Sequence, residues 1–320
     1  MSFSGEVKEE LSHMTGHGRH CQIAELAALI LFSGQLIQRS PGQWTLAVKT
    51  ENRDVLRKYF TLLKKTYNIN TDVLEQVSGI ETHKSQYTAE LSDPSTIVEI
   101  LQGIKWMDTG GMIVGRQDVV SDILIQNAET KRAFIRGAYL AAGSMSDPMK
   151  GYHLEFVCIT GRQADQLNRV LHDFDIDSKI VLRKKYHVVY VKEGSGIVDL
   201  LNIMEAHVSL MNLENLRIEK EIRNTVNRRV NCETANITKT VNAATKQVED
   251  ILLIRDRYGF GRLPENLSKA AQVRLDYPDT ALKELGEMLD PPVGKSGMNH
   301  RLRKLGEIAD QIRTGNLKEE

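Results

Sequence analysis

The segment "KSGMNHRLRK" at residues 295–304 carries side chains that could bind a nucleic acid, with four bases and no acid. On a helix, Asn299 and Arg303 would lie one turn apart. In the major groove of DNA, an Asn can pair with adenine and an Arg with guanine, while lysines mostly contact phosphates. These residue types predict a DNA-binding surface, called the recognition face below: Lys295, Ser296, Asn299, His300, Arg303 and Lys304.

A helix can present this face only if its other side is anchored, and residues 280–313 have the required pattern. We expect a crossing helix to pass close to Gly286, and we expect the Val293 side chain to fill the turn between the two helices. Ser296 is expected to cap the second helix. Two apolar stripes predict the buried sides of the helices: Leu282, Leu285 and Leu289, then Met298, Leu302, Leu305 and Ala309. The pattern is similar to the helix-turn-helix of bacterial sigma factors, and the alternative is a solvated basic helix in a three-helix bundle.

Two other basic stretches are candidate phosphate contacts. Residues 179–192 are expected to form a hairpin that carries Arg183, Lys184 and Lys185. Such side chains can contact phosphates without sequence preference, although hairpin tips are also charged for solubility. Two interpretations also remain open for Arg228 and Arg229. They could contact phosphate, or they could dock the linker segment in which they lie.

Charge and cysteine content limit the class of protein. Because 42 Lys and Arg balance 42 Asp and Glu, any nucleic-acid binding must depend on local patches. Cys21, Cys158 and Cys232 are far apart, which predicts a reducing cytoplasm, no disulfide and no zinc site. Three histidines near the start are expected in a loop and not at a metal: His13, His17 and His20. The sequence contains no apolar run long enough to cross a bilayer and no apolar stretch typical of a signal peptide at its start.

The first 210 residues show one order of elements twice. Apolar periodicity predicts helices at 23–32, 52–67 and 96–104, with strands at 43–50 and 86–91. It then predicts helices at 131–143, 162–174 and 195–204, with a strand at 152–160 and the hairpin at 179–192. Matching Gly34 to Gly143 aligns the two sets, which indicates an internal duplication.

The helix that leads each repeat is rich in small residues, as in "AELAALILFSG" and "FIRGAYLAAG". This part of the chain resembles the LAGLIDADG homing-endonuclease fold, in which two such helices pack together and each ends in an acid that holds the ions for DNA cleavage. On that motif, Ser33 and Ala142 occupy the acid positions, and neither can supply an anionic ligand for Mg²⁺. Asp147 follows closely, but its "SDP" context is typical of a turn. We therefore expect no catalytic residue, no metal site and no cofactor.

The whole chain resembles the WhiA family of Gram-positive bacteria, on the stretches "MSFSGEVKEEL", "FIRGAYLAAGSMSDP", "VNCETAN" and "SGMNHRLRKL". The expected fold class is α+β, with a duplicated LAGLIDADG-like domain at 1–213 in repeats of about 20–110 and 130–210. A helical, Asn-rich linker at 214–250 and an all-α helix-turn-helix domain at 251–320, with its motif at 280–313, are expected to follow.

The resemblance implies a cytoplasmic, nucleoid-associated protein that binds double-stranded DNA and is not an enzyme. It implies a transcriptional regulator of sporulation, or a protein that supports cell division and chromosome segregation, with a further transcription or cell-division protein as a second partner. Two alternatives stay open. One is a scaffold or signal-receiving protein whose first domain binds a protein or small ligand, and the other is a residual metal-dependent endonuclease.

Overall fold

The computed structural model describes residues 2–14, 16, 18–40, 43–69, 86–114 and 117–315. The chain forms two compact units, Met1–Lys220 and Glu221–Glu320. Of the three histidines predicted to lie in a loop, His17 is outside the described residues. His13 and His20 lie in helices, so the prediction was wrong for these two. Within the described ranges, no helix is both long enough and apolar enough to cross a membrane.

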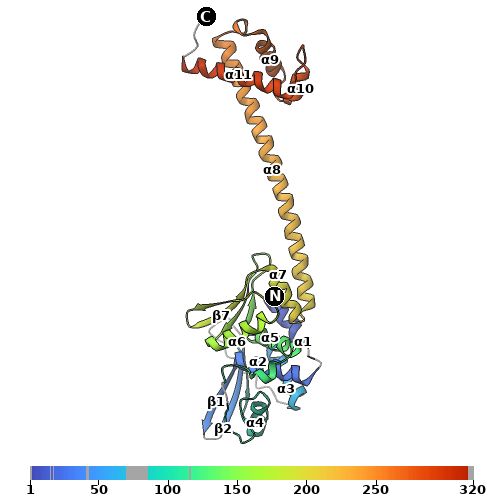
Figure 1. Cartoon of the computed structure of the whole chain (residues 1–320), viewed down its shortest axis with the longest axis vertical. Helices are drawn as coiled ribbons and strands as arrows, with labels where there is room; N and C mark the ends of the chain where they lie inside the picture. The colour runs from blue at the N-terminus through green and yellow to red at the C-terminus, as the bar shows by residue number, and fades with distance from the viewer. Residues whose placement is uncertain are drawn as a thin grey trace. The chain divides into compact units, whose positions relative to one another are not determined.

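The first unit begins with α1 (Phe3–His13) and then contains the first predicted repeat (Figure 1). The repeat consists of α2 (Arg19–Ser33), β1 (Gly34–Ser40), β2 (Gln43–Thr50), α3 (Arg53–Tyr67), β3 (Tyr87–Leu91) and α4 (Pro94–Gly103). Its strands form an antiparallel sheet in the order β1-β2-β3. The strand β1, which begins directly after α2, was not predicted from the sequence.

The second repeat follows a 3₁₀ turn, η1 (Asp122–Ile125), and has the same order of described elements with one further strand. It consists of α5 (Ala128–Ala142), β4 (Gly143–Met145), β5 (Leu154–Cys158), α6 (Gly161–His172), β6 (Lys179–Arg183), β7 (Tyr186–Val191) and α7 (Gly194–Ile203). Its antiparallel sheet has the order β4-β5-β7-β6. The hairpin at 179–192 is thereby confirmed. Residues 70–85, between α3 and β3 of the first repeat, lie outside the described ranges.

Polar caps explain where several of these helices begin. The Asn127 side chain accepts from the backbone N–H of Thr130, and the Thr130 hydroxyl accepts in return from the backbone N–H of Asn127, which starts α5. Thr160 and Gln163 form the same reciprocal cap at the start of α6. Each reciprocal cap supplies acceptors for two backbone N–H groups that would have no partner within the helix. The positions of α5 and α6 are therefore encoded locally.

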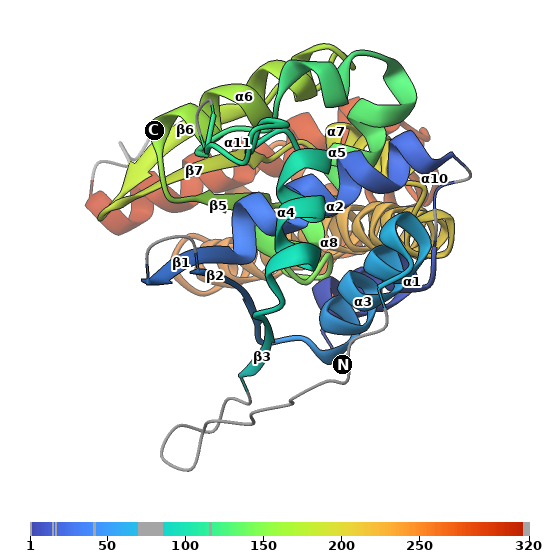
Figure 2. The ribbon, with the colours of Figure 1, turned by 90° about the horizontal axis from the view of Figure 1, so that it is seen from below.

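Helices α2 and α5 pack against each other through small residues at the centre of the first unit (Figure 2). A Cβ atom added at Gly137 would lie 2.4 Å from the backbone oxygen of Glu25 and 2.9 Å from the Cβ of Ala28. Ala138 beside it is fully buried. Glycine is therefore required where the two backbones approach most closely, which confirms the predicted pairing of the two repeats.

We expect Gly137→Ala to lower the free energy of unfolding by about 1–3 kcal/mol, because the added methyl group would overpack this crossing. Both tryptophans, Trp44 and Trp106, lie in the first unit, so urea unfolding followed by tryptophan fluorescence measures its stability. Gly151→Ala is the matched control, because no atom lies within 4 Å of a Cβ built there. Equal stability of the two variants would contradict the close approach of α2 and α5.

Gly34 and Gly143, the residues that were matched to align the repeats, end α2 and α5 in the same way. Both have extended backbones, with φ of −90° and −81°. A Cβ at Gly34 would lie 2.5 Å from the oxygen of Ile30, and one at Gly143 would lie 2.4 Å from the Tyr139 ring. The glycines are thus needed because each helix turns directly into a strand over its own last turn, and not because of a left-handed backbone.

All the elements described in the second unit, up to residue 315, are helices. Helix α8 (His207–Arg257) contributes to both units and covers the whole segment predicted as a linker. It is followed by η2 (Phe260–Arg262), α9 (Glu265–Asp276), α10 (Leu282–Glu287) and α11 (Lys295–Thr314). The C-terminal end of α8 supplies Ile251 and Ile254 to the core that α9, α10 and α11 share. The three helices expected after residue 263 are therefore present, and they pack on a fourth.

Candidate nucleic-acid interface

Helix α11 is anchored on one side and exposed on the other. Met298, Leu302, Leu305 and Ala309 are all at most 3% exposed, as their spacing predicted. The six residues of the recognition face are all exposed: Lys295, Ser296, Asn299, His300, Arg303 and Lys304. The structure therefore brings every residue predicted for the recognition face onto the solvent side of one well-packed helix.

The turn between α10 and α11 is held by the close approach of Gly286 and Val293. The backbone N–H of Val293 donates to the oxygen of Gly286 at 2.9 Å. A Cβ added at Gly286 would lie 2.2 Å from the backbone oxygen of Val293, so only glycine fits there. The prediction that a crossing helix approaches Gly286 was wrong, since the turn itself packs on this residue. The expectation that Val293 fills the turn is confirmed by its packing against the core of the second unit.

The start of α11 differs from the sequence prediction. Gly294 is the N-cap and makes no side-chain cap hydrogen bond, while Ser296 lies inside the first turn. The predicted cap at Ser296 was therefore wrong by two residues. Ser296 is exposed, as are Lys295 and Asn299.

The Arg303 guanidinium has a partner on its own helix. Its Nε lies 3.4 Å from the Glu307 carboxylate, one turn further along. Both side chains are more than half exposed, and exposed pairs of this kind contribute about 0–1 kcal/mol. The Glu307 contact therefore orients the Arg303 side chain and leaves most of it exposed. Sequence reasoning missed this pair, although its i, i+4 spacing could have revealed it.

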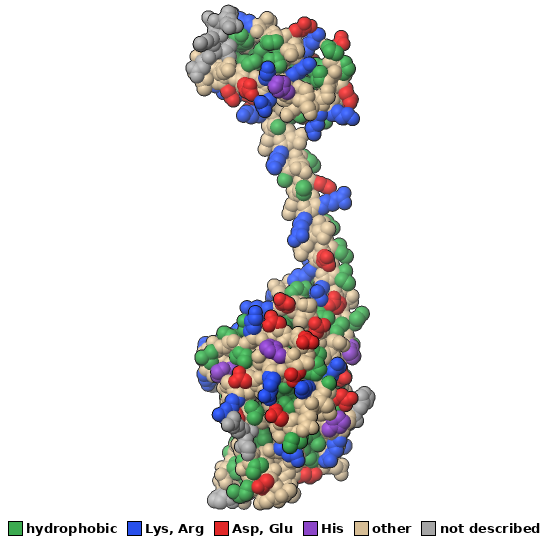
Figure 3. Space-filling view, viewed as in Figure 1, with side chains coloured by type: hydrophobic (Ala, Val, Ile, Leu, Met, Phe, Trp, Pro, Cys, Tyr) green, Lys and Arg blue, Asp and Glu red, His purple; other side chains and the backbone are tan. Residues whose placement is uncertain are grey.

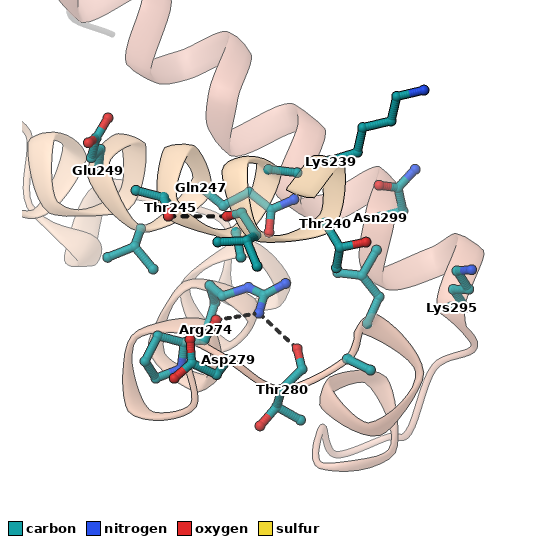
Figure 4. Close-up of a pocket in the computed structure, with 17 residues that line it drawn as sticks. Lys239, Thr240, Thr245, Gln247, Glu249, Arg274, Asp279, Thr280, Lys295 and Asn299 are labelled. Carbon is teal, nitrogen blue, oxygen red and sulfur yellow. Dashed lines mark hydrogen bonds between the residues drawn. The ribbon is translucent and has the colours of Figure 1, made fainter. Parts of the chain in front are cut away.

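A pocket of about 780 Å³ lies between α8 and the turn at 278–282, and Lys295 and Asn299 border it (Figure 4). Arg274 from α9 lies in it, 3% exposed, and donates to the backbone oxygens of Pro278 at 3.0 Å and Thr280 at 2.9 Å. Burial lowers the pKa of Arg274. Sequence reasoning did not identify Arg274, which fixes the turn that leads into α10.

The far end of α11 is tied to α8 by an ion pair. Arg313 donates to Asp250 at 2.6 Å, and it also pairs with Asp310 at 2.8 Å. The hydrogen bonds to Asp250 and Asp310 raise the pKa of Arg313. Asp250 is itself only 4% exposed, so this contact fixes α11 against the helix that enters the unit. The recognition face is therefore held at the C-terminal side of α11 as well as by its core.

The basic hairpin of the first unit is partly engaged by its own neighbours. Arg183 donates to Glu155 at 3.1 Å. The Lys185 amine lies 5.3 Å from the centre of the Tyr186 ring, a distance typical of a cation–π contact. Lys184 has a φ of 56° and forms the exposed tip with Lys185. Lys184 and Lys185 are thus exposed at the tip, and Arg183 is paired with Glu155 while its side chain stays 57% exposed.

Arg228 and Arg229 lie on the exposed surface of α8 in the second unit. Arg229 pairs with Glu233 at 3.0 Å, one turn along. Neither arginine lies in a core, so the structure gives them no packing role within the described part of the chain. They stay candidates for secondary phosphate contacts.

The two positions that hold the acids in the homing-endonuclease motif lie at the ends of α2 and α5. The Ser33 hydroxyl donates to the oxygen of Leu29 at 2.6 Å, within its own helix. Ala142 offers no ligand atom. The Asp147 carboxylate accepts from the backbone N–H of Met149 at 2.9 Å, as expected for a turn. Neither helix end therefore supplies the anionic ligands that two-metal DNA hydrolysis uses.

Charge is mixed on the face of the second unit that Figure 3 shows. Lys and Arg side chains lie beside Asp and Glu on the face that Figure 3 shows. This distribution fits the formal net charge of zero for the whole chain. Any affinity for DNA must therefore depend on local groups of basic side chains and not on a uniformly basic surface.

Three family models match consecutive parts of the chain. The model described as the WhiA N-terminal LAGLIDADG-like domain matches residues 19–105, and the WhiA LAGLIDADG-like domain matches residues 131–223. The WhiA C-terminal HTH domain matches residues 226–309. These matches confirm the predicted fold class, and the last of them includes all of the recognition face.

Relatives and a solved structure are similar over nearly the full length. A protein named "Probable cell division protein WhiA" from Lachnoclostridium phytofermentans is 53% identical over 98% of this chain and 100% of its own length. A protein with the same name from Alkaliphilus oremlandii is 46% identical over 99% of this chain and 100% of its own length. The crystal structure of full-length DUF199/WhiA from Thermatoga maritima is 25% identical, with a TM-score of 0.58 over 97% of this chain and 99% of that one.

Proposed function

We propose that this chain, which belongs to the WhiA family, is a non-catalytic regulator that binds double-stranded DNA through α11. The observation that carries the proposal is the exposed recognition face on a helix whose opposite side is buried. Asn299 and Arg303 are its candidate base contacts, and Lys295 and Lys304 are its candidate phosphate contacts. Arg183, Lys184, Lys185, Arg228 and Arg229 are proposed as secondary phosphate contacts.

The cellular role we propose follows the name of the relatives, each called a probable cell division protein. A regulator in the cytoplasm that associates with the nucleoid could act on genes for cell division, chromosome segregation or sporulation. A second partner from the transcription or cell-division machinery is part of this proposal. Mapping of bound DNA across the genome of the source organism would test the role and would supply the cognate site.

We expect Arg303→Ala to weaken binding to the cognate site by about 1–3 kcal/mol, because a bidentate contact to a base would be lost. Lys304→Ala should instead weaken binding to all sequences and reduce the slope of log K against log salt by about one unit. Mobility-shift titrations of the full-length protein at several salt concentrations measure both effects. The matched control is Arg255→Ala, since Arg255 is an exposed arginine on α8 that also has an acidic neighbour, Asp256.

One result would reverse the assignment. If Arg303→Ala binds the cognate site as the unchanged protein does, while replacing Lys184 and Lys185 together abolishes binding, the hairpin of the first unit is the main DNA-binding surface. If the protein is instead a scaffold that binds no DNA, neither the unchanged protein nor any of these variants should give a sequence-specific mobility shift.

We expect no DNA cleavage, because Ser33 and Ala142 leave the ends of α2 and α5 without carboxylates to bind the catalytic ions. Supercoiled plasmid incubated with the protein and Mg²⁺ or Mn²⁺ should stay intact. Nicking that follows the protein through purification and disappears in Asp147→Asn would contradict this expectation. It would favour the residual-endonuclease alternative.

A further inference from the structure

Three potential metal ligands meet where α2 and α5 begin. The His20 Nε2 lies 3.4 Å from Glu129 Oε2, and the Cys21 Sγ lies 4.0 Å from the same oxygen. One donor atom from each residue lies within 4.8 Å of the other two. Ligand atoms around a tetrahedral Zn²⁺ lie about 3.3–3.7 Å apart, given bonds of roughly 2.0–2.3 Å. The separation of His20 and Glu129 is thus already the one that a single ion requires, and the Cys21 Sγ would have to move closer by about 1 Å or less.

The fold determines this meeting, since His20 and Cys21 belong to the first repeat and Glu129 to the second. His20 and Cys21 lie in the first turn of α2, and Glu129 lies in the first turn of α5. The small residues at the α2–α5 crossing hold the two helices side by side, which brings their starting turns together. A nitrogen, a sulfur and an oxygen ligand thus come from two rigid elements.

Gly16 and Gly18, which precede α2, lie close to the same side chains. A Cβ added at Gly18 would lie 2.5 Å from the His20 ring, so the ring rests directly on this glycine. A Cβ at Gly16 would lie 3.1 Å from the Cβ of Cys21. Glycine at these positions lets the chain pass close to both ligands, and a larger residue at Gly18 would displace the His20 ring.

A cavity of about 580 Å³ lies beside the cluster, and both Cys21 and Glu129 line it. Cys21 is 7% exposed, while the side chains of His20 and Glu129 are 57% and 75% exposed. The thiol is therefore shielded from bulk solvent, and the site is open on the side of the other two ligands. A water molecule from this side could complete a four-coordinate site.

The charges near the cluster are balanced. Arg136, which lines the same cavity, is already paired with Glu25 at 3.3 Å and Glu205 at 2.6 Å. The Arg132 guanidinium lies 5.8 Å from the centre of the Phe174 ring. A thiolate from Cys21 and the Glu129 carboxylate would neutralise a divalent ion, so the occupied site would itself carry no net charge.

We propose that His20, Cys21 and Glu129 bind one Zn²⁺ ion and that the ion links the two repeats of the first unit. The mixture of nitrogen, sulfur and oxygen ligands suits Zn²⁺ and does not suit Mg²⁺, which prefers oxygen ligands. Burial and the nearby Glu129 raise the pKa of the Cys21 thiol, so the ion displaces a proton when it binds. The site is separate from the helix ends that hold the metal ligands in the endonuclease motif.

The test is direct binding of Zn²⁺ to the full-length protein after treatment with a chelator. We expect one ion per chain, measured by competition with a colorimetric chelator. With Co²⁺ as a substitute, we expect a near-ultraviolet thiolate-to-cobalt absorption band. Cys21→Ser and Glu129→Gln should each weaken Zn²⁺ binding at least about tenfold, and Cys21→Ser should also abolish the band.

Two controls separate this site from adventitious binding. Cys232→Ser removes an exposed thiol on α8, and His153→Ala removes a second histidine that pairs with a glutamate, Glu155 at 2.9 Å. Neither change should alter the affinity or the spectrum. The proposal is overturned if the unchanged protein binds no stoichiometric Zn²⁺, or if Cys21→Ser and Glu129→Gln bind it as tightly as the unchanged protein. It is also overturned if Cys232→Ser abolishes the cobalt band.

Discussion

Replacing Glu25 with Gln is expected to lower the free energy of unfolding of the first unit by about 3–5 kcal/mol. Glu25 is fully buried, and its Oε1 lies 2.9 Å from Lys58 Nζ and 3.3 Å from Arg136 Nε. Lys58 is also fully buried, and Arg136 is 2% exposed. Glutamine keeps the shape of the side chain but removes the negative charge, so two buried cations would share a neutral neighbour.

The pH dependence of this loss identifies its cause. Burial lowers the pKa of Lys58, and Glu25 acts in the opposite direction, so the Gln variant should lower that pKa further. A lysine whose pKa is lower in the folded than in the unfolded state binds fewer protons when folded, and stability then rises with pH. The deficit of Glu25→Gln should therefore shrink as the pH is raised from neutrality, because Lys58 can then lose its proton.

Urea unfolding followed by tryptophan fluorescence, at several pH values, measures this effect. Glu90→Gln is the matched control, since Glu90 pairs with Arg39 at 3.7 Å where both side chains are largely exposed. That change should alter stability by less than about 1 kcal/mol. If Glu25→Gln changes the free energy of unfolding no more than Glu90→Gln does, the stability of the buried cluster does not depend on the charge of Glu25.

This buried ion cluster also shows what the sequence could not predict. Glu25, Lys58 and Arg136 lie on α2, α3 and α5, and no spacing rule connects residues from three helices. Each residue was indistinguishable in the sequence from a charged side chain on a solvated face, which is the usual place for such residues. Only the packing of α2 on both α3 and α5 brings the three together. The packing of α2 on α5 also produces the cluster of His20, Cys21 and Glu129, which sequence spacing had argued against.

Local periodicity, by contrast, was sufficient for the contacts made along one helix. The small residues of α5 predicted a close helix partner, and Gly137 makes that approach. The apolar spacing of α11 identified its four buried residues without error. The predictions that were missed or wrong here concern positions where the chain changes direction. The strand β1 begins where Gly34 ends a helix, and Ser296 was assigned as a cap although the turn held by Gly286 and Val293 places the start of α11 earlier.

Leu302→Ala is expected to lower the free energy of unfolding of the second unit by about 2–5 kcal/mol, since it would leave a cavity in the core. Leu302 is 3% exposed and packs in the core that also contains Leu285, Met298 and Ile254. Its neighbour Arg303 belongs to the recognition face but not to the core. Adjacent residues of α11 should therefore affect different properties, with Leu302 supporting the fold and Arg303 contacting DNA.

Amide hydrogen exchange of residues 282–314 in the full-length protein measures the stability of this helix pair directly. Exchange should be much faster in Leu302→Ala than in the unchanged protein, and Lys304→Ala should be similar to the unchanged protein. At a temperature where Leu302→Ala remains folded, its affinity for the cognate site should be nearly normal, because its side chain does not reach the surface. Arg303→Ala should show the reverse, with normal exchange and weak binding. If Leu302→Ala is stable but loses sequence preference, the buried side of α11 takes part in recognition and the assignment of its exposed side to DNA is wrong.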